Sequence, residues 1–180
     1  MGIFSLFNKN PSSDVADNDS GSSQSSATPN DTLNITPYPA AELIGLQNWI
    51  NSQPLTLDEL KGRVVLVDFW TFGCINCVRT LPHAVELYEK YKDQGFVLLG
   101  VHTPEFDAEK VPERVAQSVK DRKITYPVAQ DNQMQTWEAY DNHYWPTQYL
   151  IDKDGMVRRT HFGEGEYQQT DQAVARLLSE

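Results

Sequence analysis

The sequence predicts an α/β domain built around a parallel pair of strands. Residues 64–67 and 96–101 are apolar runs rich in β-branched side chains, which is typical of strands buried on both faces. Between them, residues 74–91 carry apolar side chains at spacings of three and four, which predicts a helix that ends before Gly95. A strand, a helix and a second strand in this order indicate parallel pairing, because parallel strands need a long crossover connection.

The region before the first strand divides into two parts. Residues 1–32 are rich in Ser, Asp, Asn and Gly and contain few apolar side chains. Such a segment cannot bury enough surface to offset the entropy of ordering, so we predict a disordered tail or tether. The domain itself is expected to span residues 33–180, and residues 40–50 have apolar side chains at helical spacing, which predicts a helix.

The remaining elements follow the second strand in order. Helices are expected at residues 112–123, 133–140 and 167–178, and a short strand at residues 124–129. Strands at 148–151 and 156–162, joined by the turn Lys153-Asp154-Gly155, predict a β-hairpin.

Composition excludes several classes of function. The formal net charge is -10, and no basic cluster is longer than two residues, so nucleic-acid binding is not expected. The longest apolar runs are far shorter than the roughly 20 residues that cross a bilayer, and no secretory signal is apparent. We therefore expect a soluble protein, cytoplasmic by default.

Cys74 and Cys77 are the only cysteines, and their C-x-x-C spacing has three physical interpretations. A structural disulfide closing so short a loop would contribute only about 2 kcal/mol. A zinc or other metal site, for binding or for delivery, would need further ligands, and no histidine lies at a regular spacing. The histidines are His83, His102, His143 and His161.

A redox dithiol is the interpretation that the position of Cys74 favours. Unpaired backbone N–H groups and the positive end of the helix dipole meet at a helix start and favour a thiolate. Cys77 follows one turn later, within reach of the first sulfur. Peroxide reduction by Cys74 alone is a lesser alternative, because Cys77 is so well placed to close a disulfide. His102, at the end of a predicted strand, is interpreted as a structural residue.

Several segments together resemble one family. They are INSQPLTLDELKGRVVLVDFWTFGCINC, GVHTPEF, ITYPVAQDN, YWPTQYLIDKDG and HFGEGEY. From about Pro39 onward the chain resembles the thioredoxin-like superfamily and, within it, the TlpA-like redoxin branch. It is most similar to thioredoxin-like domains attached to cytochrome-c-biogenesis-type membrane electron carriers. The resemblance implies a thioredoxin fold: a central mixed sheet flanked by helices, with an N-terminal extension and an insertion after the second strand of the strand–helix–strand unit.

The resemblance also implies catalytic roles for four residues. Cys74 would be the nucleophile and Cys77 the resolving thiol. Asp68 would be the buried acid that accepts a proton near Cys77, although an acid there could also be a strand-end cap. Glu105 would be the acid that TlpA-like reductases place near their cysteines, or a solvated loop residue.

Substrate-binding residues are implied in the same way. Pro146 would be the cis-proline that faces the dithiol, with Trp145 lining the substrate groove. Trp70 could be plain core, but it matches the family's active-site aromatic residue, whose role would be packing and groove shape. Thr147 follows the cis-proline. Pro82 would bend the active-site helix.

The expected activity is thiol–disulfide exchange, with protein disulfides as substrates. The resemblance implies an upstream dithiol protein as electron donor, possibly membrane-bound, no metal or organic cofactor, and a monomer. Relatives of this type commonly work outside the cytoplasm. Ile75 and Asn76 replace the Gly-Pro of thioredoxin between the cysteines, which leaves the direction of electron flow open and leans weakly toward a reductant.

Overall fold

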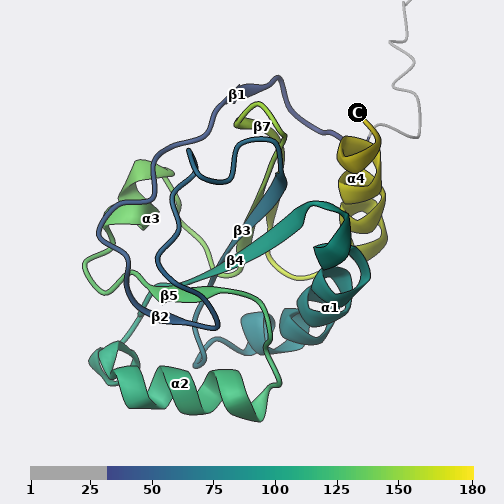
Figure 1. Cartoon of the computed structure of the whole chain (residues 1–180). Helices are drawn as coiled ribbons and strands as arrows, with labels where there is room; N and C mark the ends of the chain where they lie inside the picture. Colours follow the sequence, from purple (N-terminus) through teal and green to yellow (C-terminus); the bar gives the residue numbers. More distant parts are fainter. Residues whose placement is uncertain (1–31) are drawn as a thin grey trace, which may run out of the picture.

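A seven-stranded mixed sheet forms the centre of the molecule in the computed structural model, which describes residues 32–180 (Figure 1). The sheet order is β1-β7-β6-β3-β4-β5-β2. The strands are β1 (Tyr38–Pro39), β2 (Gln47–Ile50), β3 (Val64–Trp70), β4 (Phe96–His102), β5 (Val128–Gln130), β6 (Thr147–Ile151) and β7 (Met156–Phe162). The predicted tail lies outside the described residues, except for Thr32.

The strand directions confirm the predicted fold class. Strands β3 and β4 are parallel and joined by helix α1 (Ile75–Tyr91), and β5 continues the parallel set. Strand β6 pairs antiparallel with β3 and forms the predicted hairpin with β7. This is the thioredoxin arrangement, and the segment from η2 (Asp107–Lys110) to β5 forms the expected insertion.

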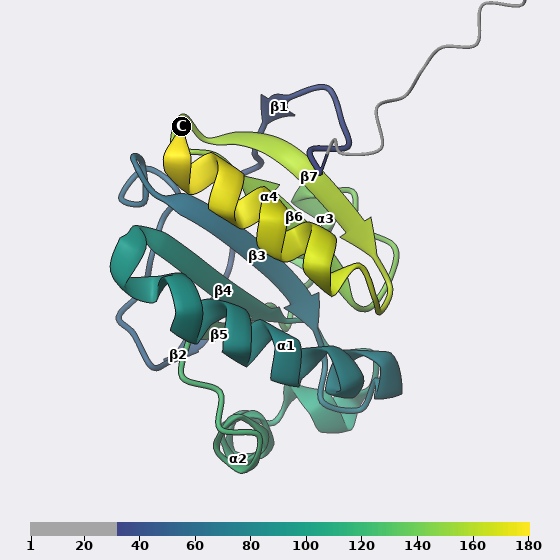
Figure 2. The same cartoon turned by 90° about the vertical axis from the view of Figure 1, so that its right-hand side faces the viewer.

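Three helices cover one face of the sheet. Figure 2 shows α1 and α4 (Tyr167–Ser179) side by side in front of the sheet, with α2 (Pro112–Asp121) on the side where β5 and β2 lie. Their buried side chains share one core with β3 and β4, and this core contains Leu66, Trp70, Cys77 and Leu81. Within residues 32–180, no helix combines the length and the apolar character that crossing a bilayer requires.

The opposite face is covered by helix α3 (Gln135–Ala139) and by the segment that precedes β3. The helix predicted at residues 40–50 is wrong, because this segment is extended and contributes β1 and β2. Gly45 and Asn48 have positive φ angles of 69° and 49°, which a helix does not accommodate. The Thr136 hydroxyl also accepts from the Ile44 N–H and donates to its carbonyl, at 2.8 and 2.7 Å. The apolar side chains of residues 40–50 therefore pack against the core from an extended chain, without forming a helix.

The strand expected at residues 124–129 is shorter and lies later in the chain. Pro127 has no N–H to donate to a sheet ladder. The carbonyls of Ile124 and Tyr126 instead accept from the side-chain amide of Asn51, both at 3.0 Å. Regular pairing therefore starts only at Val128.

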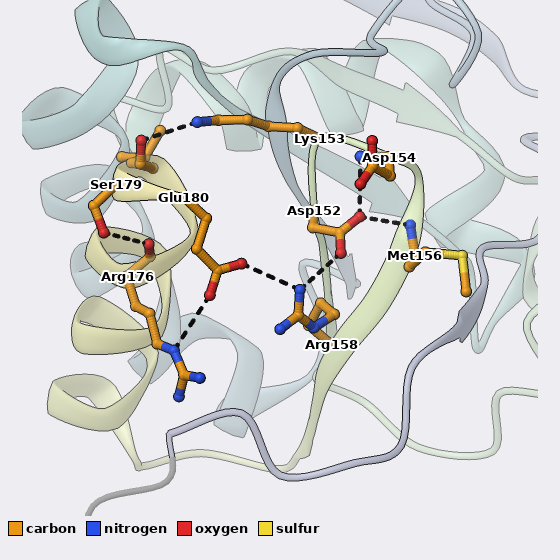
Figure 3. A network of polar contacts seen from close by, with 9 residues as sticks. Asp152, Lys153, Asp154, Met156, Arg158, Arg176, Ser179 and Glu180 are labelled. Carbon is orange, nitrogen blue, oxygen red and sulfur yellow. Dashed lines mark hydrogen bonds and ion pairs between the residues drawn. The ribbon is translucent and has the colours of Figure 1, made fainter.

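The C-terminal helix is joined to the β6–β7 hairpin by a polar network (Figure 3). The Arg158 guanidinium donates to Asp152 at 3.0 Å and to Glu180 at 3.2 Å. The Lys153 ammonium donates to the Leu178 carbonyl at 3.0 Å. Because the network binds the end of α4, it fixes that helix against the hairpin.

Candidate active site

Cys74 is the N-cap of α1, and its sulfur takes the place of the oxygen that usually caps a helix. Its backbone is extended, with φ -78° and ψ 116°, and its Sγ accepts the Cys77 N–H at 3.2 Å. Both cysteines are free thiols. Cys74 is partly exposed and Cys77 is fully buried, so an incoming disulfide can meet only the first sulfur.

The Cys77 thiol is held in its protonated form. Burial raises its pKa, and the hydrogen bond with Cys74 raises it further. A thiol must lose its proton before it can attack a disulfide. The arrangement therefore requires a base close to Cys77.

Asp68 is an acid whose charge acts on Cys77. It belongs to β3, is 1% exposed, and its charge contributes to the raised pKa of Cys77. Burial raises the pKa of Asp68 from 3.8 to about 7, although a hydrogen bond from Gln148 opposes the shift. Its Oδ1 has no hydrogen-bond partner among the described residues. A carboxyl group with this pKa and an unused oxygen can accept a proton near neutral pH.

The loop before Cys74 is fixed by two buried side chains. The Phe72 N–H points to His102 Nε2 at 3.3 Å, and the Gly73 N–H donates to Glu109 Oε1 at 3.1 Å. His102 is fully buried at the end of β4, and burial lowers its pKa to about 4, so it is neutral at pH 7. Its contacts with the backbone agree with the structural role predicted for it.

Glu105, expected as a catalytic acid or as a solvated loop residue, lies just before η2. The side chain of Glu105 is exposed, and only its backbone N–H joins the loop network, by donating to Glu109 Oε2 at 2.7 Å. The acid that reaches the loop before Cys74 is Glu109, which is 3% exposed. Sequence reasoning missed it, because a Glu within the charged run of residues 105–110 gives no sign of burial.

The Trp145–Pro146 peptide bond is cis, as the resemblance implied. The Trp145 ring is partly exposed, packs on Trp137 with centroids 4.1 Å apart, and donates from Nε1 to the Thr103 carbonyl at 3.0 Å. These contacts fix the ring. Pro146 is buried, and its carbonyl accepts the Gly163 N–H at 2.8 Å.

Two of the predicted substrate-binding side chains do not reach the surface. Trp70 and Thr147 are both 0% exposed, so direct contact with a substrate is ruled out for their side chains. Trp70 packs edge-on against His102 with centroids 5.0 Å apart. The Thr147 hydroxyl donates to the Tyr144 carbonyl at 2.8 Å. Both residues support the site from within.

Four large apolar side chains form an exposed set that we call the apolar rim. They are Ile75, Phe106, Tyr144 and Phe162, and each is 55–63% exposed. Ile75 lies between the cysteines, and Phe106 follows Glu105 in the turn held by Glu109. Tyr144 precedes the cis-proline wall and meets Phe162 edge-on at 5.8 Å. The rim therefore comes from the segments that also build the dithiol site.

The donor groups for a metal are not brought together. Among residues 32–180, no group of three or more His, Cys, Asp or Glu residues is placed to hold an ion. His83 stacks on Tyr167, and His143 and His161 lie beside acids of their own segments. The metal-binding alternative is therefore not favoured.

Comparison with known proteins places this site among thiol-dependent redox proteins. Residues 37–160 match the AhpC/TSA family. Protein DipZ of Mycobacterium tuberculosis is 48% identical over 144 residues, which cover 78% of this chain but only 21% of DipZ. The thiol-disulfide oxidoreductase YkuV of Bacillus subtilis is 30% identical over 143 residues, covering 79% of this chain and 95% of YkuV.

Solved structures agree with these relatives. A crystal structure of a thioredoxin-like superfamily protein superposes with a TM-score of 0.73 at 30% identity, covering 79% of this chain and 97% of the other. A solution structure of a thioredoxin-like protein in the oxidized form gives a TM-score of 0.71 at 28% identity, covering 78% and 95%.

Proposed function

We propose that this chain, which belongs to the AhpC/TSA family, is a thiol–disulfide oxidoreductase that reduces protein disulfides. The observation that carries the proposal is the pairing of a partly exposed sulfur at the start of α1 with a buried thiol one turn later. The hydrogen bond from the Cys77 N–H to Cys74 Sγ holds the first sulfur at the start of the helix.

The first step is attack by the Cys74 thiolate on a substrate disulfide. A bond forms between Cys74 Sγ and one substrate sulfur, and the substrate S–S bond breaks. The other substrate sulfur leaves as a thiolate. The product is a mixed disulfide between the enzyme and its substrate.

The second step releases the substrate. Cys77 attacks Cys74 Sγ, the mixed disulfide breaks, and the second substrate sulfur leaves as a thiolate. The Cys77 proton passes to Asp68, which is half ionised at about pH 7. Two electrons have then moved from the dithiol to the substrate, and the enzyme holds a Cys74–Cys77 disulfide.

The proposed substrate class rests on the exposed apolar side chains of the segments that build the dithiol site. The apolar rim offers contacts to the residues that flank a substrate cysteine, and the fixed Trp145 ring gives one firm wall. An extended peptide would lie against the partly exposed Trp145 ring, beside the cis-proline. These features fit a polypeptide disulfide better than a small polar one.

The cycle needs a donor but no organic cofactor or metal, because the two sulfurs carry the electrons themselves. A partner dithiol protein, soluble or membrane-bound, would reduce the Cys74–Cys77 disulfide again. We also propose that the domain acts as a monomer. Both edges of the sheet end in strands of two and four residues, which offer little backbone for pairing with a second copy.

The test uses single-sulfur variants and insulin as the disulfide substrate, with dithiothreitol as electron source. Cys74→Ser is expected to lower insulin reduction to the uncatalysed rate, because the attacking sulfur is gone. Reduced Cys77→Ser, freed of dithiothreitol and then mixed with insulin, is expected to accumulate a mixed disulfide that survives on non-reducing gels and disappears on reduction.

Wild-type reduction by Cys74→Ser would contradict the assignment of the nucleophile. Failure of Cys77→Ser to form any mixed disulfide would contradict its role in resolution. Thermal melting of both variants serves as the control, since loss of fold would also remove activity.

A further inference from the structure

The turn that carries η2 and the loop that leads into Cys74 are joined through one buried carboxylate. Glu109 Oε1 accepts the Gly73 N–H at 3.1 Å, and Oε2 accepts the N–H groups of Glu105 and Phe106 at 2.7 and 3.2 Å. Three backbone groups from two segments more than thirty residues apart thus meet on a single side chain. Gly73 is the residue immediately before Cys74.

Burying this carboxylate is costly, and no cation offsets the cost. Glu109 is 3% exposed, and no Lys or Arg within residues 32–180 forms an ion pair with it. A buried carboxylate without a counter-ion is stabilised only by its hydrogen bonds, which here come from backbone groups alone. If structural packing were all that the position needed, an apolar side chain would fill it at lower cost.

Glu109 Oε1 approaches the backbone of Gly73 closely. A Cβ at this position would lie 2.1 Å from Glu109 Oε1, so the Glu109 carboxylate would have to move away from the Gly73 N–H. Gly73 is not among the glycines with positive φ, so its backbone conformation does not demand glycine. Glycine at this position therefore leaves room for the Glu109 carboxylate to reach the backbone.

We propose that Glu109 is a positioning residue that fixes the nucleophile loop against the substrate-facing turn. Its Oε1 sets the path of the chain at Gly73 and thus the place of the Cys74 sulfur at the start of α1. Its Oε2 holds the turn that presents Phe106 of the apolar rim. Glu109 thereby fixes the position of the Cys74 sulfur relative to Phe106, the side chain proposed to contact the substrate.

The proposal rests on Cys74 being the attacking sulfur, and it concerns the first chemical step. A small displacement of a reacting atom is enough to lower the rate strongly, even when binding is little changed. We therefore expect loss of the Glu109 link to lower kcat rather than raise KM. A residue that served stability alone would leave both unchanged below the melting temperature.

The main variant is Glu109→Gln, which keeps size and shape but replaces one acceptor oxygen by an amide NH2. That group cannot accept an N–H, so either the Gly73 link or the turn link is lost. In insulin reduction driven by dithiothreitol, kcat is expected to fall about tenfold, with KM changing less than twofold. Asp107→Asn is the matched control, because it removes the same charge from the same turn at an exposed position paired only with Lys110. It is expected to behave as wild type.

A double-mutant cycle tests the contact itself. Gly73→Ala leaves the carboxylate in the chain but displaces it, and is expected to lower kcat about tenfold. In a Glu109→Ala background, the same glycine substitution is expected to cost less than twofold, because the clash is gone. Should Glu109→Gln fail to fold, Gly73→Ala carries the test alone.

Two results would overturn the proposal. The first is a kcat of Glu109→Gln that equals that of Asp107→Asn; if only Gly73→Ala folds, its kcat takes the place of the Glu109→Gln value. The second is full additivity in the double-mutant cycle. Cys74→Ser, measured in parallel, separates this failure from failure of the proposed function. If Cys74→Ser is inactive while Glu109→Gln equals the control, only the role of Glu109 is wrong. If Cys74→Ser is active, the proposed function itself is wrong.

Discussion

Two aspartates, one in the central strand β3 and one in the hairpin turn, differ in the number of hydrogen bonds that their carboxyl groups accept. Asp152, in the hairpin turn, is 12% exposed, and its oxygens accept the N–H groups of Asp154 and Met156 and the guanidinium of Arg158 (Figure 3). Asp68, beneath the dithiol, is 1% exposed and is bonded only by Gln148, with Oδ1 left without a partner.

The difference separates acids that hold the fold from the acid available for chemistry. A carboxylate surrounded by donors is stabilised in its charged form and fixes the segments that provide those donors. Glu109 belongs to the same group as Asp152, because three N–H groups surround it. Asp68 is destabilised as a carboxylate, which makes it a better proton acceptor near neutral pH and a weak point of the fold.

The largest expected effect is on stability, and it follows from the raised pKa of Asp68. The pKa rises from 3.8 to about 7, so between these pH values the folded protein holds a proton that the unfolded chain releases. The contribution of Asp68 to the free energy of unfolding is therefore largest below pH 4 and decreases as the pH rises to 7. At about 1.4 kcal/mol per pH unit, the total decrease is up to about 4 kcal/mol.

Asp68→Asn removes that loss, because an amide does not ionise. Urea unfolding is expected to show the variant more stable than wild type at pH 8, by at most about 4 kcal/mol, and equal to it near pH 4. A variant that is less stable at pH 8 would contradict the contrast between the two aspartates.

The next effect is on the rate of resolution. Without a base for the Cys77 proton, Asp68→Asn is expected to release substrate from the mixed disulfide roughly 100-fold more slowly at pH 7.5, in the range typical of general base catalysis. Rapid-quench measurement of the mixed disulfide follows this step directly. In the wild type, the rate should rise through about pH 7 as Asp68 ionises, and in the variant this rise should be absent. Equal rates in both proteins would remove Asp68 from the mechanism.

The smallest effect is expected at the other aspartate. Asp152→Asn weakens charge-assisted bonds to two backbone groups and to Arg158, which are worth about 1–3 kcal/mol together in stability. Thermal unfolding should show a lower midpoint, while insulin reduction at 25 °C should equal that of wild type. A change in kcat below the melting transition would show that the hairpin end and the dithiol are coupled.

The elements that could be predicted from sequence are those in which local pattern and burial agree. Strands β3 and β4 are buried along their whole length, so their continuous apolar runs were decisive. Helix α1 follows a 3.6-residue period, and the C-x-x-C pair marks its start. Asp68 stood out because an acid within an apolar strand is costly to bury without a task.

The misses arise where tertiary contacts override local pattern. Residues 40–50 have helical spacing, yet positive φ angles and the bonds to Thr136 keep them extended. Trp70 lies in the core cluster that also contains Cys77, which is one of the two interpretations that its position in the sequence leaves open. Glu109 is decided by the fold of a short turn, and nothing in the order of residues 105–110 distinguishes a buried acid from an exposed one.

The N-terminal segment has a consequence for the integrity of the sheet as a whole. Strand β1 pairs with β7 at one border and β2 pairs with β5 at the other, and both belong to one stretch of thirteen residues, 38–50. Residues 38–50 thus run across one face of the sheet and provide the outermost strand at both of its edges. Detachment of this segment would expose the backbone groups of β7 and β5 at the same time. Protection of both edges of the sheet against pairing with another sheet therefore depends on one segment of the chain.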